Sequence, residues 1–318
     1  MRKTVLCLVP FALSVGVVGA QAPPQQQLAI PGVISADARL ELVRDGFKGL
    51  LEGPVGAPDG GLYFTDMGAN RIYRINPKGD IAVWRENTNE TNGLTLLADG
   101  RVLGAEGGGQ RVVAMTPDGR VTALASAFDG NPFRGPNDLI NDKKGGVYFT
   151  DPLMRAATEG TNVKPMGNVY YIRPDGRLLL IDKEIARPNG ITLSLDEKTL
   201  YVNDGLGVDV FAFDVQPDGS AGNKRSFVKL REPITDAQGT RSRADGMAVD
   251  SAGRLYVATG SGIQVINPRG EYLGIIRVPS IMNSIAFAGP NRQTLYLTGR
   301  DSLYRIQMIA SGPAGRAK

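Results

Sequence analysis

The chain has no histidine, and its single cysteine, Cys7, lies in an apolar stretch at the N-terminus. If that stretch is removed as a signal, the remaining chain has neither residue type. A Ser-His-Asp triad, a cysteine nucleophile, histidine-ligated zinc and a histidine general base are then excluded. Any catalysis must use carboxylates, amides, hydroxyls, lysine, arginine or a metal ion held by oxygen.

Long amphipathic helical periodicity is also missing, and short alternating segments separated by turn signals take its place. The 41 glycines and 20 prolines fit a chain in which many turns interrupt short strands. The formal charge of +4 comes from no basic cluster, so no nucleic-acid partner is expected. With 42% hydrophobic residues in 318, the chain can build a sizeable core.

Residues 1–20 have the pattern of a secretory signal peptide. Arg2 and Lys3 open a mainly apolar stretch that ends in small residues at 18–20. The alternative, an uncleaved membrane anchor, is disfavoured because the apolar run is short for a membrane span. We therefore expect a periplasmic or secreted protein with no membrane partner after cleavage. Residues 21–36 have the composition of an extended linker.

One phrase recurs six times along the rest of the chain. Each copy opens with an oxygen-bearing polar residue, followed by a short hydrophobic run, a turn and a β-rich run. These opening residues, called the leading residues below, are 40, 45, 52, 56 and 38 positions apart, the size of a propeller blade. In a ring of blades they would converge on the axis. They are Glu52, Asn92, Asn137, Asn189, Asp245 and Asn283.

The sixth copy lacks a fourth strand after residues 302–308, whereas a lone strand-like segment at 40–43 precedes the first copy. Pairing the two would cover the edge that an open ring exposes. We therefore predict an all-β, six-bladed β-propeller over residues 37–310, closed by an N-terminal strand. Residues 311–318 are expected to form a disordered tail.

Four leading residues combine two carboxylates with two amide carbonyls, a set that suits a hard divalent cation such as Ca²⁺. They are Glu52, Asn137, Asn189 and Asp245. Two carboxylates neutralise the ion, and the amides add oxygens without further charge. Asn92 and Asn283 are expected on the same rim, as contacts to the outer shell of the metal or to substrate. The alternative for a single copy such as Asn92-Gly93 is a turn, since Asn-Gly is a common turn dipeptide.

The chain resembles the senescence-marker-protein/gluconolactonase/luciferin-regenerating (regucalcin-like) family in four motifs, which stand in order over nearly the whole chain after the signal. The motifs are EGPV at Glu52, Pro136-Asn137-Asp138 with YFTDP downstream, Pro188-Asn189-Gly190, and Asp245-Gly246. The resemblance implies a six-bladed propeller with an axial divalent cation, Ca²⁺ first and Zn²⁺, Mg²⁺ or Mn²⁺ as alternatives. It implies Glu52, Asn189 and Asp245 as metal ligands and Asn137 as a direct or water-mediated one. It also implies sugar-lactone hydrolysis with Asp245 as the catalytic base.

The sequence departs from the family's pattern at two places. Many bacterial relatives carry Glu-His-Gly in the second blade, where this chain has Glu106-Gly107-Gly108. Animal members place an arginine two residues before the third-blade asparagine, whereas Arg134 lies three before Asn137. Arg134 is therefore a candidate for binding substrate hydroxyls, with a loop-ordering or solvated arginine as the alternative. The long segments 152–167 and 231–243 are either a substrate cap or solvated insertions.

Three functions follow from these residues. The first is a metal-dependent lactonase in which the cation activates water and Asp245 takes its proton, with a small sugar lactone as partner. The second is another esterase or a phosphotriesterase on the same metal, which the polarity of the pocket would separate from the first. The third is a non-catalytic exported binding propeller with a structural calcium, because a fold does not fix a function.

Overall fold

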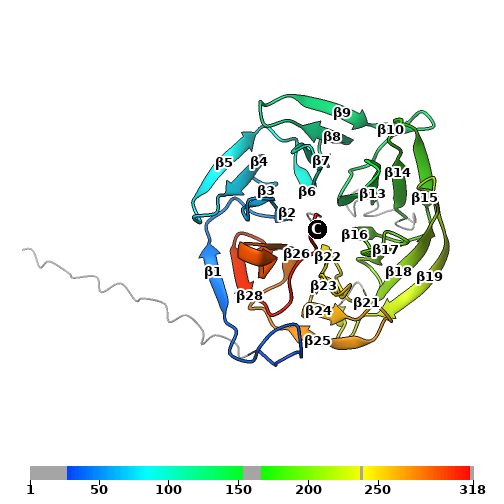
Figure 1. Ribbon diagram of the computed structural model, residues 1–318. Helices are drawn as coiled ribbons and strands as arrows, with labels where there is room; N and C mark the ends of the chain where they lie inside the picture. Colours follow the sequence, from blue (N-terminus) through cyan, green and yellow to red (C-terminus); the bar gives the residue numbers. More distant parts are fainter. Residues whose placement is uncertain (1–26, 153–165, 237–238, 316–318) are drawn as a thin grey trace, which may run out of the picture.

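The structure is a computed structural model that describes residues 27–152, 166–236 and 239–315 (Figure 1). Within these residues, six four-stranded antiparallel sheets surround one axis. The predicted six-bladed β-propeller is confirmed. The predicted signal peptide lies outside the described residues. No helix in the described ranges is long and apolar enough to cross a membrane.

The first five blades each use four consecutive strands, numbered outward from the axis. Blade 1 contains β2 (Leu51–Gly56), β3 (Leu62–Asp66), β4 (Arg71–Ile75) and β5 (Ile81–Glu86). Blade 2 contains β6 (Thr91–Leu96), β7 (Val102–Glu106), β8 (Arg111–Met115) and β9 (Val121–Ala125). Blade 3 contains β12 (Leu139–Asn141), β13 (Val147–Asp151), β14 (Asn168–Ile172) and β15 (Leu178–Asp182).

The next two blades follow the same plan. Blade 4 contains β16 (Pro188–Leu193), β17 (Thr199–Asp204), β18 (Asp209–Val215) and β19 (Ala221–Lys229). Blade 5 contains β22 (Met247–Val249), β23 (Leu255–Thr259), β24 (Gly262–Ile266) and β25 (Tyr272–Ile276). Two hairpins lie outside the blades, β10 (Ala127–Phe128) with β11 (Asn131–Pro132) and β20 (Ile234–Asp236) with β21 (Gly239–Arg241).

The sixth blade draws its strands from both ends of the described chain. Its strands are β26 (Met282–Ala288), β27 (Thr294–Gly299), β28 (Leu303–Gln307) and β1 (Leu40–Arg44), with the short 3-10 helix η2 (Pro290–Arg292) between β26 and β27. Figure 1 shows the blue β1 along the outer side of the red β28. Leu40 pairs with Ile306, and Arg305 Nε lies 2.8 Å from Glu41 Oε2. The predicted closure by an N-terminal strand is confirmed.

The core consists of apolar layers between adjacent blades. Between blades 3 and 4, for example, Tyr148 and Ile140 of one sheet pack in the same buried cluster as Ile191 and Leu200 of the other. A fully buried side chain of this size contributes roughly 1.5–3 kcal/mol. Each blade therefore depends on its two neighbours, and the ring holds the inner strands in fixed positions around the axis.

The segment expected as a linker differs from that expectation wherever it is described. Ile30, Val33 and Ile34 are buried in a cluster with residues of blades 5 and 6. A turn with Gly32 at φ 69° brings Ile30 opposite Ile34. The Gln27 side chain bonds the backbone of Arg277 at 2.8 and 2.9 Å. The polar composition of the segment concealed these three apolar residues. Burial of their side chains favours a packed segment over a mobile linker.

The C-terminal tail is also packed at its start. The N–H of Gly312 donates to the carbonyl of Arg292 at 2.8 Å, and the N–H of Ser251 donates to the carbonyl of Ser311 at 2.7 Å. Gly312 and Pro313 are buried. The predicted disordered tail is therefore wrong for residues 311–313, whose backbone groups have partners in blades 5 and 6, while residues 316–318 lie outside the described residues.

Candidate functional site

The leading residues lie on or next to the innermost strand of their blades. Glu52, Asn92, Asn189 and Asn283 lie within β2, β6, β16 and β26. Asn137 and Asp245 stand two residues before β12 and β22. The Asn-Gly steps at Asn92 and Asn189 are thus part of strands, and the turn alternative is wrong for both.

Hydrogen bonds join five of the six leading residues to a neighbouring blade. Thr65 Oγ1 donates to the carbonyl of Asn92 at 3.0 Å, and Gly93 N donates to that of Asn137 at 2.7 Å. Thr150 Oγ1 donates to the carbonyl of Asn189 at 2.8 Å, and Asn203 Nδ2 donates to that of Asp245 at 2.6 Å. Gly246 N donates to the carbonyl of Asn283 at 2.8 Å. The ring closes where Asn283 Nδ2 donates to the carbonyl of Leu51 at 3.1 Å. These hydrogen bonds engage backbone carbonyl groups and fix the backbone positions from which the leading side chains extend.

The glycine after a leading residue allows the close approach of the next blade. A Cβ placed on Gly190 would lie 2.2 Å from the carbonyl oxygen of Asp245. A Cβ on Gly246 would lie 2.0 Å from Ser284 Oγ. Asn-Gly and Asp-Gly occur here because the inner strands approach one another too closely for a side chain at the second position.

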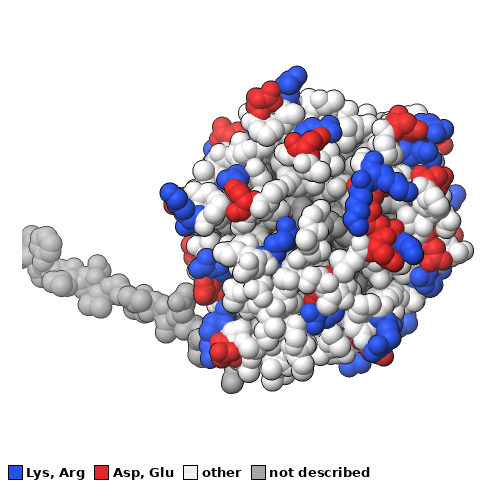
Figure 2. All heavy atoms as spheres, in the orientation of Figure 1, with Lys and Arg blue, Asp and Glu red and all other residues white. Residues whose placement is uncertain are grey.

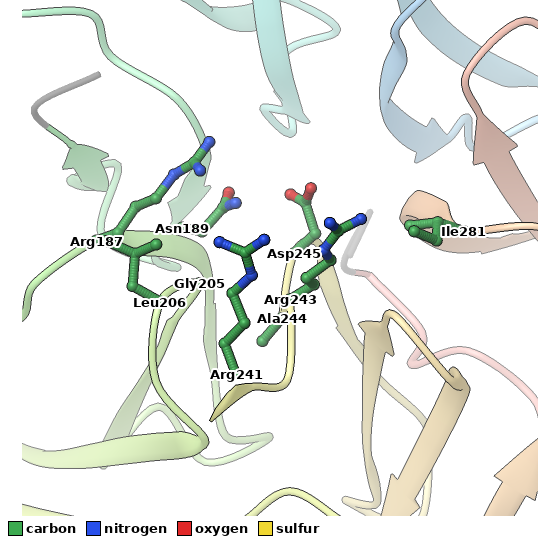
Figure 3. A pocket seen from close by; sticks show the side chains of 9 residues that line it. All are labelled: Arg187, Asn189, Gly205, Leu206, Arg241, Arg243, Ala244, Asp245 and Ile281. Atoms are coloured by element: carbon green, nitrogen blue, oxygen red, sulfur yellow. The ribbon is translucent and has the colours of Figure 1, made fainter. Parts of the chain in front are cut away.

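A cavity of about 280 Å³ opens beside the axis at blades 4 and 5 (Figure 3). The residues that line it are Arg187, Asn189, Gly205, Leu206, Arg241, Arg243, Ala244, Asp245 and Ile281. Figure 3 shows the side chains of Asn189 and Asp245 next to each other, with the guanidinium groups of Arg187, Arg241 and Arg243 around them. Its volume is close to the lower end of small-molecule sites, about 300–1,000 Å³.

Asn189 and Asp245 form the polar centre of this cavity. The amide of Asn189 donates a hydrogen bond to the Asp245 carboxyl. The buried Oδ1 of Asn189 accepts none within the described residues. A buried carbonyl oxygen without a donor is costly unless a ligand or ion completes it.

The Asp245 carboxyl has a strongly shifted pKa. Burial raises the pKa of Asp245 to about 7, although part of the side chain faces the cavity. The Arg187 guanidinium opposes this rise, while the Asp138 carboxylate adds to it. A carboxyl whose pKa lies near neutrality can exchange a proton with a substrate under ordinary conditions.

The other predicted metal ligands are also buried near the axis. Glu52 and Asn137 are each 8% exposed. In the described ranges, no three His, Cys, Asp or Glu side chains are grouped to hold a metal. A cation at this position would therefore need amide oxygens among its ligands, as the predicted set has in Asn137 and Asn189.

The predicted substrate-binding residues have different surroundings. Asn92 is buried on β6. The amide nitrogen of Asn283 is engaged by the carbonyls of Leu51 and Gly299. Arg134 is exposed, its Nη1 donates to the carbonyl of Met166 at 2.6 Å, and it does not line the cavity.

Sequence reasoning missed the three arginines of the cavity. Arg187 and Arg243 each stand two residues before a leading residue, and Ile281 has the same position in blade 6. This register was visible in the sequence once the blades were aligned. Arg241 ends the β20–β21 hairpin, so the segment 231–243 does reach the cavity. Most of the other segment, 152–167, lies outside the described residues.

Charged side chains elsewhere are mixed in sign. On the face shown in Figure 2, basic and acidic groups are interspersed around the ring. Many form exposed ion pairs such as Arg269–Glu271 at 2.8 Å, which contribute little to stability. The arginines of the cavity are a different arrangement, because three of them share one concave site.

Comparisons with known proteins give a consistent result. The family model described as the SMP-30/gluconolactonase/LRE-like region matches residues 50–300. A gluconolactonase of Zymomonas mobilis is 29% identical over 282 residues, covering 82% of this chain and 79% of that protein. A pentonolactonase, XacC, of Haloferax volcanii is 29% identical over 253 residues, covering 78% and 81%.

Among solved structures, the gluconolactonase XC5397 from Xanthomonas campestris superposes with a TM-score of 0.77 at 28% identity, covering 91% of this chain and 95% of that one. The match of the family model runs from β2 through β27 and so reaches all six blades. The resemblance drawn from four short motifs is thereby confirmed. The chain belongs to the SMP-30/gluconolactonase/LRE-like family.

Proposed function

We propose that this protein hydrolyses a small lactone of the sugar-acid class, with a divalent cation at the Asn189–Asp245 centre. The observation that carries the proposal is this pair, a carboxyl bonded by an amide whose own oxygen has no partner within the described residues, in a cavity beside the propeller axis. Relatives covering about four fifths of the chain are named gluconolactonase and pentonolactonase, which supports the substrate class.

The residues of the site fit a hard cation. Glu52, Asn137, Asn189 and Asp245 would hold it, Ca²⁺ being the first choice, and the bound ion would supply polarisation of the lactone carbonyl and a lower pKa for water. The fit rests on the unpartnered Asn189 Oδ1 and on the two carboxylates, Glu52 and Asp245, on the inner faces of separate blades.

A side chain of this protein, the Asp245 carboxylate, would accept the proton of the attacking water. The Asp245 carboxylate accepts a proton from the water whose oxygen attacks the lactone carbonyl carbon. The ring C–O bond then breaks, the leaving oxygen takes up a proton, and the product is a hydroxy acid. The Asn189 amide holds the carboxyl in place, and the fixed start of β22 limits its movement.

The test is hydrolysis of a panel of aldonolactones, with chelation and metal add-back, by the wild type and two variants. Asp245→Asn keeps a carbonyl oxygen but loses the proton acceptor, so its rate should stay about 10²–10⁴-fold low even at saturating metal. Asn189→Ala should lose activity through weaker metal occupancy, and excess metal should partly restore it.

The exposed Asn131→Ala serves as the matched control, because this amide donates to the nearby carbonyl of Asp129 and does not line the cavity. Full recovery of Asp245→Asn at high metal would show that Asp245 only holds the ion. Turnover of no lactone, with or without metal, would reject the proposal. The esterase and the binding propeller would then remain as alternatives. Hydrolysis of apolar phosphotriesters is disfavoured, because three arginines line the cavity.

We also propose that the protein is exported. The support is the charged start, apolar stretch and small-residue end of residues 1–20.

A further inference from the structure

The cavity beside Asp245 is unusually rich in positive charge. Arg187, Arg241 and Arg243 line it, and Asp245 is the single carboxylate among the described residues of its lining. A divalent cation at the leading residues would add more positive charge beside them. Hydroxyls of a neutral sugar require hydrogen-bond partners but no positive charge, whereas a guanidinium with an unused donor, as at Arg187, suits an anionic group.

Arg187 is held firmly at the cavity wall. Its backbone N–H donates to Asp204 Oδ1 at 3.1 Å, and its carbonyl accepts from the N–H of Gly205 at 2.9 Å. The following Pro188 starts β16, which carries Asn189. The Nε of Arg187 is buried and has no hydrogen-bond partner within the described residues. A guanidinium on an anchored backbone with an unused buried donor is ready to bind a ligand.

Arg243 lies on the opposite side of Asn189 and Asp245 in a strained backbone conformation. Its φ is 50°, a left-handed value that is uncommon for a residue with a side chain. The preceding Ser242 fixes this conformation, because its N–H donates to the carbonyl of Gly207 at 2.8 Å and its carbonyl accepts from Gly260. Strain of this kind gathers at binding and catalytic sites.

We propose that the lactone substrate carries an anionic group, a carboxylate or a phosphate, which Arg187 binds at the cavity wall while Asp245 acts at the ring carbonyl. The inference rests on the proposed lactonase function and narrows its substrate class. The planar fork of a guanidinium matches two oxygens of a carboxylate or phosphate, and such charge-assisted pairs are stronger than neutral ones.

The experiment compares three lactones that share one ring: an uncharged hexonolactone, the same lactone with a carboxylate at carbon 6, and the same lactone with a phosphate at carbon 6. The readout is the ratio of kcat/KM for each anionic lactone to that for the neutral one. This ratio cancels changes that Arg187 makes through Asp245, because those affect all three substrates alike.

The wild type should prefer at least one anionic lactone, and the larger of the two ratios identifies carboxylate or phosphate as the bound group. Arg187→Gln should lower that ratio by roughly 10- to 100-fold, as expected for losing a hydrogen bond to a charged group. Arg187→Lys should lower it less, because the charge remains. The control Arg269→Gln, on an exposed turn of blade 5 outside the cavity, should leave it unchanged.

Two results would overturn the inference while leaving the lactonase function in place. One is equal or better turnover of the neutral lactone. The other is an equal loss on all three lactones in Arg187→Gln, which would assign Arg187 to the reacting oxygen or to Asp245 instead. Turnover of none of the three would overturn both the inference and the proposed function.

Discussion

At the scale of single residues, the site depends as much on small side chains as on polar ones. Gly190 follows the candidate ligand Asn189, and its α-carbon faces the carbonyl of Asp245 in the next blade. The lack of a side chain here lets β16 lie close to the start of β22. The two candidate ligands reach the same cavity because of that approach.

Gly190→Ala should therefore damage stability and site together. The added Cβ would lie 2.2 Å from the Asp245 carbonyl oxygen, so the blades must separate, at a cost of about 1–3 kcal/mol or more. Chemical denaturation should show this loss, with weaker metal binding by calorimetry.

Gly222→Ala, on the outer strand β19 with open space around the new Cβ, is the matched control and should change stability by less than about 1 kcal/mol. Similar stability of the two variants would contradict the close approach that we describe.

At the scale of elements, the segment before β1 belongs to the propeller. Ile34 is 1% exposed in the cluster of blades 5 and 6, whereas Leu28 is 71% exposed six residues earlier. The carbonyl of Val33 accepts hydrogen bonds from the N–H groups of Ile309 and Ala310, so this segment joins the two ends of the described chain beside the closing strand.

Ile34→Ala should lower the free energy of unfolding by about 2–5 kcal/mol, the usual cost of emptying a buried isoleucine site. Leu28→Ala should change it by no more than about 0.5 kcal/mol, because its side chain is already in water. Urea denaturation of both variants checks this. An Ile34→Ala protein as stable as wild type would indicate that the segment is a linker and does not stabilise the propeller.

At the scale of the whole molecule, the ring of hydrogen bonds and the proposed cation act on the same inner strands. The bonds run from each blade to the next leading residue and close at Asn283 and Leu51. A cation held by Glu52, Asn137, Asn189 and Asp245 would add a second connection across blades 1, 3, 4 and 5.

Chelation should therefore lower the Tm by several degrees, because an ion that binds only the native state adds roughly 2.7 kcal/mol when its concentration is 100 times Kd. Differential scanning calorimetry before and after verified metal removal measures the shift. Asn189→Ala should show a smaller shift, since one proposed ligand is gone. An unchanged Tm in the wild type would argue against an axial cation.

The architecture and the candidate ligands could be predicted from the amino-acid sequence. Blade number, ring closure and the six leading residues all follow from a local repeat, because strand alternation and turn residues are encoded within a few positions of each other. The absence of histidine likewise excludes imidazole catalysis and imidazole metal ligands through composition alone.

The side chains that share the cavity could be identified only from the folded chain. Arg134 was the arginine that the motifs suggested, yet it turns to the carbonyl of Met166, while Arg187, Arg241 and Arg243 line the site. The packing of Ile30, Val33 and Ile34 on blades 5 and 6 was equally hidden. Both outcomes depend on contacts between segments far apart in the chain, and side-chain direction at a strained position such as Arg243 is set by those contacts rather than by sequence spacing.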